Sequence, residues 1–171
     1  MKRIQILIVV LLTGFLTKAQ SPADELFDKY SGKEGFTTVY ISKYMFDMFS
    51  NIESTDPEAK EMKEVINKLT GIKIISSEKK DESVNFVKEM KKKIASGGYK
   101  ELMVVKEEKQ DVQFLVKDND GKISELLIVV SGEGNNVLIS IQGDINMKSI
   151  SKLSKAMNIE GMEQLENIDK K

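Results

Sequence analysis

Four residue types are missing or nearly missing from this chain. Its 171 residues include no cysteine, no histidine and no tryptophan, and the only arginine is Arg3. These types usually supply acid–base catalysis near neutral pH, thiol chemistry, ligands for soft metals and bidentate recognition of phosphate. Most enzyme classes are therefore not expected. Without cysteine no disulfide can form, so the hydrophobic core alone must stabilise the fold.

Clustered positive charge and aromatic residues are also scarce. Aromatic residues make up 6% of the chain, and 26 basic residues are balanced by 27 acidic ones. Beyond the first three residues, every basic residue is a lysine. No basic segment interleaved with aromatic residues occurs, so nucleic-acid binding is not expected.

The first 19 residues have the pattern of a secretory signal peptide. Lys2 and Arg3 form a positive start, and an apolar stretch runs from Ile4 to Leu16. Thr17 and Ala19 are small residues at the positions that precede a cut after Ala19. The apolar stretch is shorter than the roughly 20 residues that span a bilayer, so we predict a cleaved leader and not a retained anchor.

Cleavage would release a soluble, mildly acidic product. No cysteine follows the apolar stretch, so no lipid attachment and no stable membrane anchor are expected. Loss of residues 1–19 removes three basic residues and changes the formal net charge from −1 to −4. We therefore expect the mature chain in the periplasm or outside the cell.

Residues 20–157 are predicted to form one domain, followed by a polar tail over 158–171, because no linker or repeat divides the chain. Helices are predicted from Ser21 to Tyr30, Ser42 to Phe49, Asp56 to Leu69, Asp81 to Ala95 and Met147 to Met157. Strands are predicted from Phe36 to Ile41, Ile72 to Ser76, Glu101 to Lys106, Val112 to Lys117, Ile123 to Val130 and Asn136 to Gln142.

This order of elements indicates an α+β fold. Helices and strands alternate in the first half, whereas the last four predicted strands follow one another with short turns between them. We therefore expect helices packed on one face of a mostly antiparallel sheet that ends in a four-strand meander.

Local signals set the expected helix ends and inner faces. Ser21 and Ser42 are predicted to cap helices, and Gly71 to end one. The spacing of Tyr44, Met45, Met48 and Phe49 predicts a buried helical stripe. Methionines at helical spacing usually fill a core, and this interpretation is applied to Met45, Met48, Met62, Met90, Met147 and Met157.

Two glycine-containing segments resemble ligand loops but are interpreted as turns. Asp118–Gly121 looks like part of a calcium loop, yet the outer ligand positions would fall on Val116 and Leu127, which cannot coordinate. Gly132–Gly134 follows a strand, but no helix follows it to receive a phosphate. Both segments suit tight hairpins, and Gly143-Asp144 is assigned a structural part at the end of the last strand.

The remaining patterns carry no assigned chemistry. Ser76–Lys79 and Ser149–Lys152 match Ser-x-x-Lys, but the companion motifs of that chemistry are missing. Carboxylate pairs could support glycoside hydrolysis, although the acids fall mostly on solvated faces. Lys88–Lys93 is interpreted as a solvated helix face, since acids are interspersed with its lysines. We predict no catalytic, cofactor-binding or metal-binding residues, and no cofactor.

The end of the chain resembles a known family. The resemblance rests on three segments near the C-terminus, which are Glu125–Glu133, Val137–Ile145 with its Gly-Asp-Ile sequence, and Ile150–Leu153. The predicted leader and the early strand Phe36–Ser42 also fit. These segments are similar to an uncharacterised domain-of-unknown-function family, number 4252, of exported Bacteroidota proteins. The resemblance implies export but transfers no activity and no functional residues.

The function favoured by the sequence is a non-enzymatic, exported domain that binds an envelope protein or another envelope component. An edge strand of the sheet could accept a strand of such a partner. Two alternatives stay open. One is a hydrolase that uses carboxylates or a Ser/Lys pair, and the other is a carrier of a small apolar ligand between helices and sheet.

Overall fold

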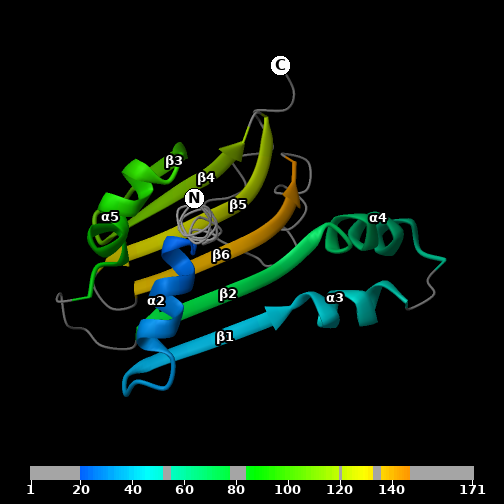
Figure 1. Cartoon of the computed structure of the whole chain (residues 1–171), viewed down its shortest axis with the longest axis horizontal. Coiled ribbons are helices and arrows are strands. Elements are labelled where there is room, and N and C mark those ends of the chain that lie inside the picture. Colours follow the sequence, from blue (N-terminus) through cyan, green and yellow to red (C-terminus); the bar gives the residue numbers. More distant parts are fainter. Residues whose placement is uncertain (1–19, 52–54, 78–83, 120, 133–135, 147–171) are drawn as a thin grey trace, which may run out of the picture.

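A computed structural model describes residues 20–51, 55–77, 84–119, 121–132 and 136–146. Within these ranges, four helices accompany one antiparallel sheet of six strands (Figure 1). The predicted leader, the predicted helix from Met147 to Met157 and the C-terminal tail lie outside the described residues.

The observed elements follow the predicted ones closely. The helices are α2 (Pro22–Tyr30), α3 (Lys43–Ser50), α4 (Pro57–Ile66) and α5 (Phe86–Ser96). The strands are β1 (Phe36–Ser42), β2 (Leu69–Ser77), β3 (Tyr99–Lys106), β4 (Gln110–Asn119), β5 (Lys122–Gly132) and β6 (Asn136–Ile145). No helix in the described part of the chain is long and apolar enough to cross a bilayer.

The sheet has the strand order β1-β2-β6-β5-β4-β3, and every neighbouring pair is antiparallel. The predicted α+β class is confirmed, and β3 to β6 form the predicted meander. The whole sheet is not a simple meander, because β2 pairs with β6 and places Ile72 opposite Ile141. This pairing leaves β1 and β3 at the two edges of the sheet.

Side chains alternate between two buried faces of the sheet. In β4, Phe114 joins the cluster on one face and Leu115 the cluster on the other. In β5, the four residues from Leu126 to Val129 are all fully buried. A strand that is buried on both faces needs a continuous apolar run, which explains the sequence Leu-Leu-Ile-Val-Val in β5.

Helices α2 and α5 cover one face of the sheet (Figure 1). Leu26 and Tyr30 from α2 and Phe86 and Met90 from α5 pack there against Leu127 and other strand residues. Helices α3 and α4 extend beyond the ends of β1 and β2 (Figure 1). Their buried residues Phe46 and Val65 belong to the cluster on the opposite face.

Helix α2 begins as its sequence predicts. The Ser21 side chain accepts a hydrogen bond from the Ala23 backbone N–H at 3.2 Å, and Pro22 occupies the first turn. Ser42 stands at the predicted N-cap position of α3, but its side chain makes no capping hydrogen bond.

Besides the missing cap at Ser42, three sequence predictions about local structure are wrong. Gly71 does not end a helix, because β2 has already begun at Leu69 and includes it. Gly143 does not end the last strand, since β6 continues to Ile145. The predicted buried stripe of α3 is exposed instead, with exposed fractions between 45% and 74% for its four members, Tyr44, Met45, Met48 and Phe49. Amphipathic spacing places side chains on one helix face, but α3 contacts the core through Phe46 instead.

Gly143 permits a close approach between β6 and the start of β2. Its φ is +153°, and a Cβ there would lie 2.3 Å from the carbonyl oxygen of Lys68 and 2.8 Å from Cα of Leu69. The next residue, Asp144, donates its backbone N–H to the same Lys68 oxygen at 2.9 Å. A side chain at Gly143 would therefore push the backbones of β6 and β2 apart.

We expect Gly143→Ala to lower the free energy of unfolding by about 3 kcal/mol or more, because it adds a backbone clash to conformational strain. Gly121→Ala is the matched control. Gly121 has φ +84° with open space around a Cβ, so only the strain of about 1 kcal/mol should appear. Urea unfolding of both variants measures the difference, and equal losses would contradict the role of the close approach.

Candidate functional site

A row of polar residues crosses the sheet beneath the N-terminal end of α2. Tyr99 of β3 pairs with Lys117 of β4, Lys117 pairs with Glu125 of β5, and Glu125 pairs with Gln142 of β6. Cross-strand partners point to the same face of a sheet, so these side chains meet on the face that α2 and α5 cover. The Lys117 ammonium accordingly lies 5.7 Å from the centre of the Tyr99 ring.

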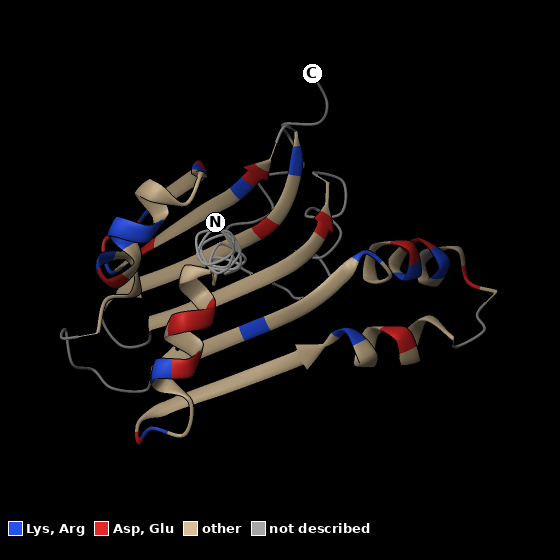
Figure 2. Ribbon diagram, viewed as in Figure 1, with Lys and Arg blue, Asp and Glu red and all other residues tan. Residues whose placement is uncertain are grey.

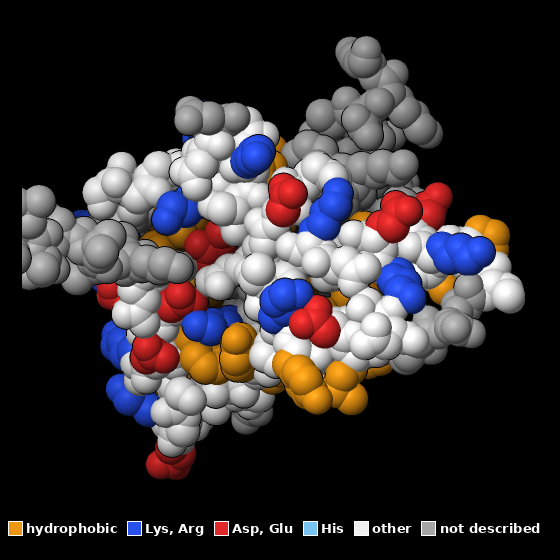
Figure 3. Space-filling model, turned by 45° about the vertical axis from the view of Figure 1, so that its right-hand side comes forward, with side chains coloured by type: hydrophobic (Ala, Val, Ile, Leu, Met, Phe, Trp, Pro, Cys, Tyr) orange, Lys and Arg blue, Asp and Glu red, His pale blue; other side chains and the backbone are white. Residues whose placement is uncertain are grey.

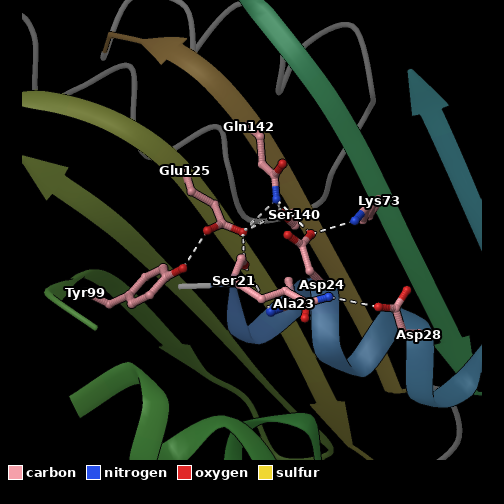
Figure 4. A network of polar contacts seen from close by, with 10 residues as sticks. Ser21, Ala23, Asp24, Asp28, Lys73, Tyr99, Glu125, Ser140 and Gln142 are labelled. Atoms are coloured by element: carbon pink, nitrogen blue, oxygen red, sulfur yellow. Dashed lines mark hydrogen bonds and ion pairs between the residues drawn. The ribbon is translucent and has the colours of Figure 1, made fainter. Parts of the chain in front are cut away.

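Glu125 is the centre of this row and is only 3% exposed. Its Oε1 accepts hydrogen bonds from Ser21 Oγ and Ser140 Oγ, both at 2.6 Å, and a longer one of 3.4 Å from Gln142 Nε2. Its Oε2 accepts one from Tyr99 OH at 2.5 Å (Figure 4). A buried carboxylate is costly unless its oxygens are satisfied, and these donors satisfy both of them.

A second carboxylate extends the network toward β2. Gln142 Nε2 also donates to Asp24 Oδ1 at 3.0 Å, and this oxygen forms an ion pair with Lys73 Nζ at 2.7 Å (Figure 4). The Lys73 ammonium lies 5.4 Å from the centre of the Phe27 ring and 5.5 Å from that of Tyr40. The polar chain therefore runs from buried Glu125 to an exposed tyrosine on the edge strand β1.

Burial and the neighbouring Glu125 carboxylate together raise the pKa of Tyr99 well above its usual value of about 10. Burial disfavours the phenolate, and the negative charge of Glu125 repels it. Tyr99 is therefore a firm hydrogen-bond donor to Glu125 at any physiological pH.

Chemically, the cluster brings together two acids, two serines and a lysine, which are the residue types that the hydrolase hypothesis requires. Ser21, Ser140 and Glu125 are nevertheless buried, and each oxygen of Glu125 is already hydrogen-bonded. The geometry thus ties the N-terminus of α2 to β3, β5 and β6. Sequence analysis missed this cluster, although an acid at the start of the apolar run in β5 signalled it.

The sequence motifs that suggested ligands have structural positions. Val116 and Leu127, the outer positions of the calcium-like loop, are core residues. Gly121 has a positive φ and donates its backbone N–H to Asp118 Oδ1 at 2.8 Å, as a tight turn requires. This bond, after the stronger one from Lys100, lowers the pKa of Asp118. Within the described residues, no three acids gather as a metal site would need.

The other motifs are only partly described. Ser76 lies in β2, whereas Lys79, the segment 133–135 and the segment Ser149–Lys152 are outside the described residues. The lysine patch of α5 shares its surface with acids, as predicted. Lys93 forms an ion pair with Glu25, and Glu89 forms one with Lys29 at 2.5 Å.

An exposed apolar surface is the second feature that stands out. Among the described residues, six large hydrophobic side chains are between 41% and 74% exposed, and all six lie on β1 or α3. We call this set the β1–α3 surface. It consists of Val39, Tyr40, Tyr44, Met45, Met48 and Phe49. Groups of hydrophobic side chains lie in the lower half of the face shown in Figure 3.

Charge is nearly absent from this surface. Strand β1 contains no charged residue, and it is uncoloured along its whole length in Figure 2. On α3, Lys43 and Asp47 form an ion pair with each other at 2.6 Å. Val39 and Tyr40 are neighbours in β1 and point to opposite faces of the sheet, so this surface spans the edge of the sheet. A concentration of exposed aromatic and methionine side chains on two consecutive elements is typical of an interaction site, whereas single exposed hydrophobic residues are ordinary.

We expect Glu125→Ala to lower the free energy of unfolding by about 3 kcal/mol, because several buried hydrogen-bond donors would lose their acceptor. Glu125→Gln keeps an oxygen for the two serine hydroxyls and should lose less. Glu101→Ala, at an exposed acid of β3, is the control and should change stability by about 0.5 kcal/mol at most. Chemical denaturation measures all three, and a Glu125→Ala loss no larger than that of the control would contradict the network.

The raised pKa of Tyr99 predicts an alkaline loss of stability. The folded chain holds the Tyr99 proton more tightly than the unfolded chain does. The contribution of Tyr99 to the free energy of unfolding is therefore fully present below about pH 10, the pKa of an unfolded tyrosine, and is lost as the pH rises above it. In the Tyr99→Phe variant, the free energy of unfolding should decrease less steeply as the pH rises. Tyr30, whose pKa burial also raises, remains in both proteins and leaves a residual slope.

The measurement is urea unfolding at about pH 8 and about pH 11, on either side of the ordinary tyrosine pKa. Tyr44→Phe, at a tyrosine that is 74% exposed, is the matched control. An alkaline loss that is the same in Tyr99→Phe and in the unmodified chain would refute the assignment.

Comparison with known proteins places this chain in a family. The model of a family described as "Domain of unknown function (DUF4252)" matches residues 30–153, which is well over half of the chain. No curated protein and no solved structure matches the chain significantly. The match includes the β1–α3 surface, Tyr99, Glu125 and Gln142, whereas Ser21 and Asp24 precede it. The chain belongs to the DUF4252 family of domains of unknown function.

Proposed function

We propose that this protein is an exported, non-enzymatic domain that binds a protein of the cell envelope through the β1–α3 surface. The observation that carries the proposal is the concentration of exposed aromatic and methionine side chains on two consecutive elements. The leader predicted over residues 1–19, and the resemblance to exported Bacteroidota proteins, support the location.

The residue types of the β1–α3 surface suit protein recognition. Tyrosine, phenylalanine and methionine are enriched in the central part of protein interfaces, where charged residues are depleted. The two methionines can adapt their flexible side chains to a partner, while the aromatic rings offer large contact area with few rotatable bonds. The absence of unpaired charge within α3 limits the cost of removing water from this surface.

The network beneath the surface supports rigid presentation of Tyr40. The Lys73 ammonium makes cation–π contacts with the rings of Phe27 and Tyr40, and its ion pair with Asp24 fixes its position. Phe27 also contacts Tyr40 edge-to-face, with 6.4 Å between the ring centres. A side chain that is held before binding loses less conformational entropy when a partner arrives.

The same network argues for a structural use of Glu125 in preference to a catalytic one. A general acid or base must reach its substrate, but Glu125 is 3% exposed, and the two serines that donate to it, Ser21 and Ser140, are buried as well. The proposal therefore assigns the cluster to anchoring α2, and the interaction to the exposed apolar side chains.

The test is photocrosslinking in the native cell envelope, with a photoreactive phenylalanine analogue in place of Tyr44. We expect a protein adduct whose yield falls about tenfold when Met48→Asp is added, since charge in the centre of an interface removes a large share of its affinity. Lys91→Asp on α5, which is also an exposed position, is the control and should leave the adduct unchanged.

Adducts that persist in the Met48→Asp variant, or that form equally from a photoreactive residue at position 91, would contradict a specific β1–α3 interface. Binding of the purified chain to protein-free lipid vesicles, abolished by Met48→Asp, would instead identify a membrane surface as the target and overturn the proposal of a protein partner.

A further inference from the structure

The two edges of the sheet differ in how they are protected. Strand β3 carries Lys100, Glu101 and Lys106, and its register with β4 shifts between Glu101 and Met103. Charges and irregularities of this kind keep an edge strand from pairing with another chain. Strand β1 has neither, because it contains no charged residue or proline and pairs with β2 without a register shift.

The β1 sequence is complementary to itself in antiparallel register. If Val39 lies opposite Val39 of a second copy, Phe36 faces Ser42 and Thr38 faces Tyr40 on the α2 side of the sheet. On the opposite side, Thr37 faces Ile41. Each bulky ring is thus placed against a small side chain, and β-branched residues meet one another, as favourable cross-strand pairs do.

The two ends of β1 carry complementary charges. Glu34 lies just before the strand and Lys43 just after it, and both are exposed. Antiparallel pairing brings the Lys43 end of one copy beside the Glu34 end of the other. Lys33, next to Glu34, has its ammonium 5.6 Å from the centre of the Tyr30 ring.

From these observations we propose that β1 pairs with β1 of a second copy of this chain, forming a twofold-symmetric dimer with a continuous twelve-stranded sheet. The inference rests on the proposed function, because it names the partner of one part of the β1–α3 surface. Val39 and Tyr40 become buried in the dimer. The apolar side chains of α3, beyond the end of the strand, are presented once at each end of the new interface.

A charge exchange at the symmetry axis tests the proposal. Val39 is 41% exposed, so Val39→Lys and Val39→Glu leave the monomer core intact. In the dimer each substitution places like charges directly opposite one another, and we expect dimerisation to weaken about 100-fold. An equimolar mixture of the two variants restores opposite charges and should dimerise again. Sedimentation velocity of the purified mature chain measures each sample.

Val104→Lys and Val104→Glu, in the middle of the other edge strand, are the matched controls and should dimerise like the unmodified chain. The absence of cysteine permits a separate test of register. A chain with Thr37→Cys mixed with a chain with Ile41→Cys should form a mixed disulfide, whereas Val104→Cys should not form one with either.

A monomeric unmodified chain at about 100 µM, a concentration at which even weak specific dimers associate, would overturn the inference. A dimer that the Val39 variants do not disrupt, or that their mixture does not restore, would overturn it as well. A separate result tests the proposed function. If Tyr44 adducts to another envelope protein persist in a chain that is monomeric, the interaction surface stands and the second copy does not.

Discussion

The pairing of β2 with β6 is the constraint on which the rest of this structure depends. It joins the N-terminal half of the chain to the meander through contacts between residues about 70 positions apart, such as Ile72 and Ile141. Loop-closure entropy opposes such distant contacts, so they must be repaid by apolar burial on both faces of the central strands. The same pairing leaves β1 at the outer edge, next to α3.

The buried Glu125 cluster is the polar counterpart of this constraint. Its donors come from Ser21 before α2, from the first residue of β3 and from β6, so one carboxylate fixes a helix end against three strands. Such a network specifies position more strictly than apolar contact, because a shifted donor leaves a buried charge unsatisfied. Successive contacts through Gln142, Asp24 and Lys73 also reach Tyr40, so a continuous chain of polar contacts links the interior to the exposed surface.

Much of the fold could be predicted from the sequence, because the signals for it are local. Ser21-Pro22 starts a helix, and alternating apolar residues such as Val112, Phe114 and Val116 mark strands, wherever the rest of the chain lies. The exposure of α3 could not be predicted in this way. The spacing of Met45 and Met48 says that they share a helix face, but only the tertiary structure decides whether that face meets the core.

The Glu125 site was missed for a related reason. Its donors lie as far as 104 positions away, and no short motif links Ser21, at the start of α2, to an acid in the meander. Within the described residues, β1 is an uncharged edge strand and α3 follows it directly, and exposed apolar side chains lie on both elements.

The central claim is that a partner covers the β1–α3 surface in solution. Hydrogen–deuterium exchange of the mature chain, at low and high protein concentration and with added envelope fraction, tests it most directly. The account predicts that peptides covering residues 36–49 exchange more slowly at high concentration or with the envelope fraction, while peptides of β3 are unchanged. Equal exchange of residues 36–49 under all three conditions would contradict it.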